Sequence, residues 1–260
     1  MVHQFEMGIW LLFLAYFVSV AGSTIGLACA NQARTATGSA RIGWLTLAAV
    51  SLGGVGIWLM HFIGLLGFAT PGQPIRYDIA RTLLSAVLAI AAVFVGLLLF
   101  GVQKRSALWR LLVAGTITGL AVNVMHYTGM WAVNIKGTID YNPFLVVLSV
   151  LIGIGAATAA LWFTVSAEGL SQRLMAGLVM GVASTGMHYT GMAAVNVTLN
   201  AEAPDPAGVE VFSFLFPVFI LSAAALAVPI VALLTAPRED AENEPAQVGD
   251  NRALGAAPAR

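Results

Sequence analysis

The sequence predicts an all-α membrane protein: a seven-helix transmembrane bundle made of three two-helix repeats plus a seventh helix. Hydrophobic residues make up 59% of the 260 residues, charged residues make up 9%, and the mean hydropathy is +0.87. Such a chain has too little polar surface to coat a soluble globule of its length. The apolar residues also fall into seven long runs, and a short histidine-containing string recurs along them.

Each apolar run is long enough to cross a membrane. The hydrocarbon core of a bilayer is about 30 Å thick, which a helix of roughly 20 residues spans. A segment in lipid must satisfy its own backbone hydrogen bonds, so we expect helices and not strands. The predicted spans cover about residues 7–30, 42–69, 79–101, 111–135, 143–165, 174–197 and 211–236.

Composition divides the chain into two parts. Residues 1–236 hold the seven spans, whereas residues 237–260 are polar and rich in alanine. A segment of that kind cannot bury a core, so we expect 237–260 to be a disordered tail. We expect no effector domain after the last span.

The basic residues beside the spans predict the orientation, because cytoplasmic loops carry an excess of lysine and arginine. Seven of them fall on one side and three on the other, which places the N-terminus outside and the tail in the cytoplasm. The seven are Arg34, Arg41, Lys104, Arg105, Arg110, Arg173 and Arg238, and the three are Arg76, Arg81 and Lys136.

The repeated string is Met-His-Tyr-Thr-Gly-Met, which occurs at Met125–Met130 and again at Met187–Met192. A relaxed copy, Met-His-Phe-Ile-Gly-Leu, occupies Met60–Leu65. The three copies lie in the second, fourth and sixth spans, which all run in the same direction. Repetition of this kind indicates a duplicated structural unit.

The three strings carry His61, His126 and His188, which are expected at one depth, about eight residues or roughly 12 Å from the outer helix ends. A glycine also precedes each histidine by seven residues. That step nearly completes two turns of an α-helix, so glycine and histidine share one stripe. Small residues let membrane helices approach closely, so we expect this stripe to face the bundle interior. The three glycines are Gly54, Gly119 and Gly181.

Three imidazoles at one depth predict a metal site. An ionisable side chain inside a membrane costs free energy unless it is paired, which makes it a candidate functional group. Neutral imidazole is a common metal ligand, and the thioethers of Met130 and Met192, one turn after their histidines, favour a soft ion such as Cu(I). The predicted metal ligands are His61, His126, His188, Met130 and Met192.

Other readings of the histidines stay open. They could hydrogen-bond neighbouring helices and serve packing alone. Two of them could hold a haem between facing helices, or all three could line a transport path for an ion or a small molecule. No paired carboxylates, nucleophile with base, phosphate-binding loop or nucleic-acid patch accompanies them, so the sequence predicts neither an enzyme nor a nucleic-acid partner.

The Met-His-Tyr-Thr strings resemble the bacterial MHYT family, an integral membrane sensor domain named after this tetrad. The resemblance covers about residues 7–236. It implies a protein of the bacterial inner membrane that binds copper and senses a diatomic gas such as oxygen, carbon monoxide or nitric oxide. Family members often carry cytoplasmic signalling domains after the last span, so the resemblance implies signalling through a separate partner here. Leu65 departs from the motif, because it replaces the methionine expected after the first histidine.

Overall fold

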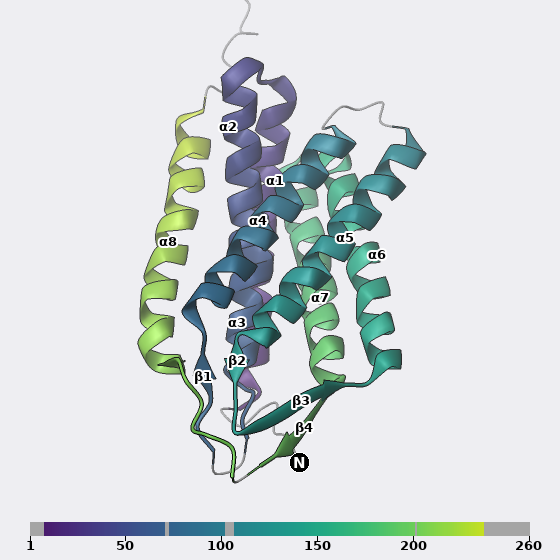
Figure 1. Ribbon diagram of the computed structural model, residues 1–260. Helices are drawn as coiled ribbons and strands as arrows, with labels where there is room; N and C mark the ends of the chain where they lie inside the picture. The colour runs from purple at the N-terminus through teal and green to yellow at the C-terminus, as the bar shows by residue number, and fades with distance from the viewer. Residues whose placement is uncertain (1–7, 71–72, 102–106, 201, 237–260) are drawn as a thin grey trace, which may run out of the picture.

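A computed structural model describes residues 8–70, 73–101, 107–200 and 202–236 of the protein. Long helices lie side by side in a bundle, and short strands gather at one end of it, which we call the strand end (Figure 1). This arrangement of seven helical spans confirms the predicted fold class. The tail predicted at 237–260 lies outside the described residues.

The helices match the predicted spans in number and order. One span is continuous through three labels, since α2, η1 and α3 follow one another without a break. The helices are α1 (Trp10–Thr35), α2 (Gly38–Ala49), η1 (Val50–Leu59), α3 (Met60–Leu65), α4 (Ile79–Phe100), α5 (Leu108–Trp131), α6 (Pro143–Ser166), α7 (Leu170–Ala193) and α8 (Val211–Thr235). Among the described residues, six spans are long and apolar enough to cross a membrane; α7, which is rich in glycine, serine and threonine, falls short of that hydropathy.

Six of the spans form a closed ring. Going round it, the α2–η1–α3 span packs between α1 and α4, α5 follows α4, α6 follows α5, and α7 closes the ring between α6 and α1. Helix α8 stands outside, against α1, α2 and η1 (Figure 1). The histidine-bearing spans therefore alternate with the others, as three copies of one two-helix unit require.

Five short strands link the helices at the strand end. They are β1 (Arg76–Tyr77), β2 (Val133–Asn134), β3 (Gly137–Tyr141), β4 (Val195–Leu199) and β5 (Val209–Glu210). The order β2–β1–β5 makes one antiparallel sheet, and β3 pairs antiparallel with β4, from Gly137 opposite Leu199 to Tyr141 opposite Val195. The spans predicted at 111–135 and 174–197 therefore began and ended too late, because α5 ends at Trp131 and α7 at Ala193. Their β-branched last residues leave the helix and form β2 and the start of β4.

Two equivalent backbone hydrogen bonds fasten neighbouring helices at this end. The N–H of Asp78 donates to the carbonyl of Ala132 at 2.9 Å, and the N–H of Asn142 donates to that of Ala194 at 2.8 Å. In both cases the donor is the N-cap of a ring helix, α4 or α6, and the acceptor is the C-cap of a histidine-bearing helix, α5 or α7. The helix ends that follow the histidine strings are thus held in register.

The second span contains a ten-residue π-helix, η1, directly before its histidine string. The predicted α-helical stripe from Gly54 to His61 was therefore wrong, because a π-helix holds more residues in each turn. A Cβ on Gly54 would meet only the Ile90 side chain, at 3.5 Å, whereas one on Gly53 would lie 2.6 Å from the carbonyl oxygen of Ala89. In the second span the close contact with the neighbouring helix, α4, thus lies at Gly53, one position earlier in the repeat than Gly119 and Gly181.

The other two stripe glycines lie at close helix contacts, as predicted. A Cβ on Gly119 would come within 3.0 Å of the α6 backbone at Ile154, and one on Gly181 would do the same with the side chains of Val20 and Tyr16 on α1. Their partners are the ring helices without histidines. The histidines themselves are left to face the centre of the ring.

Candidate metal centre

The three histidines meet at the centre of the ring near the strand end. His61 lies in α3, His126 in α5 and His188 in α7, and their exposed fractions are 1%, 0% and 0%. They share one depth, as predicted, but they are closer to their helix ends than expected. Four or five residues, roughly 6–8 Å of helix, separate each from the last residue of its helix.

Their Nδ1 atoms converge. The Nδ1 atom of His61 is 2.9 Å from that of His188 and 3.1 Å from that of His126. The rings stand edge to face, with centroids 4.8, 4.9 and 5.4 Å apart. Among the described residues, this is the one group of three or more His, Cys, Asp or Glu side chains whose ligand atoms all lie within 4.8 Å of one another.

Three neutral imidazoles cannot satisfy one another in this arrangement. Each Nδ1 atom offers either one N–H or one lone pair. His61 lies close to both others, so it must share a single donor or a single acceptor between two partners. A cation at the centre accepts all three lone pairs at once, at metal–nitrogen distances of about 2 Å. The donor set therefore fits a metal ion.

Met130 and Met192 are buried one turn beyond His126 and His188, each with 1% of its surface exposed. Met130 also lines the cavity at the strand end that is described next. Leu65 occupies the equivalent position after His61 and is likewise buried. The structure thus brings the three histidines together, while ligation by the two sulfur atoms stays a prediction.

A cavity of about 400 Å³ lies at the strand end, over α5 and the strand β3. Its walls combine polar and aromatic groups, and it adjoins the histidine centre through Tyr127 and Met130. The Tyr127 hydroxyl lies 2.9 Å from that of Ser149, and its ring packs against Tyr141. Burial raises the pKa of Tyr141 to about 12, with Tyr127 adding to the shift. The lining residues are Arg81, Tyr127, Met130, Trp131, Val133, Asn134, Ile135, Gly137, Ile139 and Tyr141.

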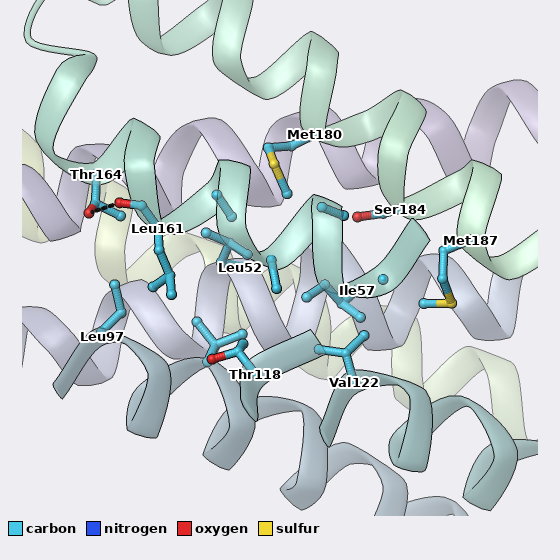
Figure 2. Close-up of a pocket in the computed structure, with 15 residues that line it drawn as sticks. Leu52, Ile57, Leu97, Thr118, Val122, Leu161, Thr164, Met180, Ser184 and Met187 are labelled. Carbon is cyan, nitrogen blue, oxygen red and sulfur yellow. Dashed lines mark hydrogen bonds between the residues drawn. The ribbon is translucent and has the colours of Figure 1, made fainter. Parts of the chain in front are cut away.

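A second, smaller cavity of about 30 Å³ lies within the ring on the other side of the histidines. Ile57, Val122 and Ser184, which precede the three histidines by four residues each, all line it. Figure 2 shows side chains from several helices, Leu52, Leu161 and Met180 among them, around this space. Its lining is almost wholly apolar, and no charged residue contributes to it.

The remaining members of the tetrad have local partners. The hydroxyls of Thr128 and Thr190 donate to the carbonyls of Val124 and Gly186 in their own helices, as threonine in a helix often does. Tyr189 stacks edge-on against its neighbour His188, with ring centroids 4.8 Å apart. These residues support the motif helices around the centre.

Comparison with known proteins bears on the histidine strings directly. The family model described as "Bacterial signalling protein N terminal repeat", MHYT, matches residues 54–115 and 119–177. These two matches contain the strings at Met60–Leu65 and Met125–Met130. The chain belongs to the MHYT family. The third string, at Met187–Met192, completes the centre of this MHYT domain.

Two relatives of the MHYT domain come from Pseudomonas aeruginosa. One, named bifunctional diguanylate cyclase/cyclic di-GMP phosphodiesterase MucR, is 38% identical over 197 residues, which are 74% of this chain and 28% of the relative. The other, cyclic di-GMP phosphodiesterase NbdA, is 35% identical over 75% of this chain and 25% of the relative. Signaling protein YkoW of Bacillus subtilis is 29% identical over 81% and 26%. The chain thus spans about a quarter of the length of these signalling proteins.

No solved structure is similar to this MHYT domain. Its relatives place the domain in bacterial signalling proteins and, with the spanning helices, in a membrane. The relatives' names give the catalytic activities of those longer proteins.

Haem does not fit the MHYT domain at this position. Two axial imidazoles stand on opposite faces of a porphyrin, whereas the Nδ1 atoms of His61 and His188 are only 2.9 Å apart. The 30 Å³ cavity next to them is far smaller than a macrocycle. Cys29 is buried in α1 and lies outside the group that could share an ion.

Sequence reasoning missed two features of the site. The glycines that follow each histidine by three residues, Gly64, Gly129 and Gly191, contact the imidazoles, and their recurrence in all three strings was the available signal. The small cavity was also missed. Three of its lining residues, Ile57, Val122 and Ser184, lie four positions before the histidines, but their side chains differ between copies and carry no pattern.

Proposed function

We propose that this MHYT domain is a membrane sensor that binds copper at His61, His126 and His188. The observation that carries the proposal is the convergence of three Nδ1 atoms, one from each repeat, on a single buried point. A centre built from all three repeats responds to any change in how the repeats pack. Binding at that point can therefore be read at the far ends of the helices.

Copper is favoured over other ions by the surroundings of the centre. The site is apolar and fully buried, and burying a monovalent ion costs less than burying a divalent one. The thioethers of Met130 and Met192, both fully buried one turn away, prefer a soft ion. Cu(I) meets both conditions, whereas three imidazoles alone would serve zinc equally well.

The sensed molecule that we propose is a diatomic gas such as oxygen, carbon monoxide or nitric oxide. When bound, copper supplies the affinity for such a molecule. The 30 Å³ cavity beside the histidines supports this class, because it has room for about one molecule of that size. Its lining is almost wholly apolar, which suits a small apolar molecule: the Thr164 hydroxyl donates to the carbonyl of Leu161, and the Thr118 hydroxyl is the buried lining hydroxyl without a hydrogen-bond partner among the described residues.

We propose that the role of this domain is sensing and that its output passes to a signalling partner. The relatives' names describe enzymes that make or degrade cyclic di-GMP, and the matched residues form about a quarter of those chains. In the proposed orientation, in the bacterial inner membrane, the N-terminus and the strand end face outward and the C-terminus faces the cytoplasm. The partner would then meet the end of the bundle that is richer in arginine.

Metal analysis of the detergent-purified protein tests the proposal. We expect close to one copper per chain, and we expect His126→Ala and His188→Ala each to remove most of it. His61→Ala should behave alike, because its Nδ1 atom lies between the other two. A control substitution at Val182, which is 64% exposed on the same helix as His188, should leave copper unchanged.

The gas is tested by adding carbon monoxide to the reduced, copper-loaded protein. We expect a new infrared carbonyl band, which His126→Ala abolishes. A protein without copper that loses only stability in the histidine variants would favour a packing role. A haem Soret band, or substrate uptake by reconstituted vesicles, would favour the haem or transport alternatives.

A further inference from the structure

The glycine three residues after each histidine lies against the imidazole of a different repeat. A Cβ on Gly64 would fall within 3.0 Å of the Nε2 atom of His188 and 2.7 Å from its Cδ2. Gly129 stands in the same relation to His61, and Gly191 to His126. Real Cβ atoms essentially never come so close to another heavy atom, so each imidazole occupies space that only glycine leaves open.

We infer that Gly64, Gly129 and Gly191 are positioning residues that seat the three imidazoles and aim their Nδ1 atoms at the centre. The three contacts form a cycle. The third repeat's histidine sits on the first repeat's glycine, the first repeat's histidine on the second's, and the second repeat's histidine on the third's. Each repeat thus completes the seat of its neighbour.

The seats decide which ring nitrogen is available. The Nε2 atoms of His61, His126 and His188 are buried and have no hydrogen-bond partner among the described residues. Each faces a glycine backbone, so it has no room for a ligand. The Nδ1 atoms are left as the metal-binding atoms, and their spacing of 2.9 and 3.1 Å follows from where the rings are held.

The competing explanation is that these glycines only allow close helix packing. The two explanations predict different energetic couplings. If Gly129 seats an imidazole, its substitution by alanine should be coupled to His61, which lies on another span. It should be coupled weakly to His126, although that residue is only three positions away on its own helix.

Double-mutant cycles on the full-length protein without metal test this coupling. We expect Gly129→Ala to lower the unfolding midpoint markedly in the wild-type background and little in a His61→Ala background, where the methyl group has space. The loss should persist in a His126→Ala background. Equal losses in all three backgrounds, or relief by His126→Ala, would overturn the inference. If Gly129→Ala alone folds poorly, the yield of folded protein serves as the measure: the Gly129→Ala/His61→Ala double variant should fold, and its failure to fold would contradict the inference.

Two spectroscopic and binding measurements complete the test, with Gly186→Ala as the control because a Cβ there meets no atom within 4 Å. In ¹⁵N-histidine spectra of the metal-free protein, we expect Gly129→Ala to shift the ring signals of His61. We expect Gly186→Ala to leave the His61 signals in place. Unchanged His61 signals in Gly129→Ala would contradict the seat. Copper affinity should fall by about 10–100-fold in Gly129→Ala, as for other residues that orient metal ligands, and stay unchanged in Gly186→Ala.

The inference rests on the proposed copper site only for that last measurement. If the wild-type protein binds no copper, the proposed function fails, and the coupling and ring-signal results still decide whether the seats exist. If copper binds equally well in Gly129→Ala, the seats fail and the copper site stands.

Discussion

Each histidine of the centre turns one nitrogen toward the other two rings and buries the other nitrogen against a glycine. Without a metal this is an unfavourable arrangement, because the Nδ1 atom of His61 must share one N–H or one lone pair between two partners. Side chains kept in such an arrangement are typical of a binding site, where the ligand resolves the conflict. The Nδ1 contacts of His61 therefore support the proposed ligand site over a role in packing alone.

Replacing His188 by leucine should expose this difference. We expect the metal-free His188→Leu protein to be as stable as the wild type or more stable by about 1–3 kcal/mol, because an unsatisfied polar group has been removed. The stabilisation that copper gives the wild type should disappear. Thermal unfolding with and without copper measures both effects, with an exposed substitution at Val182 as the control. A large loss of stability without metal would instead mean that the imidazole serves packing.

At this scale the sequence predicted the participants but not their contacts. The shared depth of His61, His126 and His188 followed from the repeat. Helical phase gave the inward direction of His126 and His188, whereas the α-helical stripe predicted for His61 was wrong. Which nitrogen faces inward depends on contacts between different repeats, such as that of His61 with Gly129, and no spacing within one helix encodes them. Met130 and Met192 were predicted ligands and stay so.

The second span differs in its winding from the other two histidine-bearing helices, α5 and α7. The π-helix η1 carries its extra residues directly before His61 and moves the close helix contact from Gly54 to Gly53. The copies in α5 and α7 reach the same result with ordinary helical turns. The first string therefore reaches the centre in register although its span is wound differently. Periodicity in the sequence could not show this, because a π-helix is set by packing and not by residue preference.

Two matched alanine substitutions test the register of η1. Gly53→Ala should destabilise the protein by about 1–3 kcal/mol, because the new methyl group meets the carbonyl of Ala89 in α4. Gly54→Ala should be neutral or stabilise by up to about 1 kcal/mol, since it meets only the end of the Ile90 side chain and restricts the unfolded chain. Unfolding in detergent measures both. If Gly54→Ala were the more destabilising substitution, the segment before His61 would be a regular α-helix with Gly54 at the close contact.

Over the whole molecule, six spans close into a ring and α8 remains outside it. Span number, order and approximate limits were predictable, because they depend on apolar length alone. The closure of the ring between α1 and α7 was not, since helices so far apart in sequence leave no local signal of their contact. Strand β2 and the start of β4 were missed because Val133, Val195 and Val197 continue the apolar runs of α5 and α7.

Two truncations distinguish ring helices from the outer helix. A chain ending at residue 206 lacks α8 but keeps the ring, and we expect it to retain copper. A chain ending at residue 167 also lacks α7 and its His188, and we expect it to lose copper completely. Metal analysis of both membrane-purified products measures the difference. If the longer product already loses its copper, α8 takes a direct part in the centre.

The ring can close only after α7 has been synthesised, because α7 fills the place between α1 and α6. A chain is synthesised from its N-terminus, so α1 and the helices bearing His61 and His126 enter the membrane before α7 has been translated. Helix α7 is also the ring member that falls short of the hydropathy of the others, so it gains least from lipid and most from its place between α1 and α6. During biogenesis, His61 and His126 are therefore in the membrane before His188 joins them. Metal occupancy would then mark a finished and correctly inserted chain.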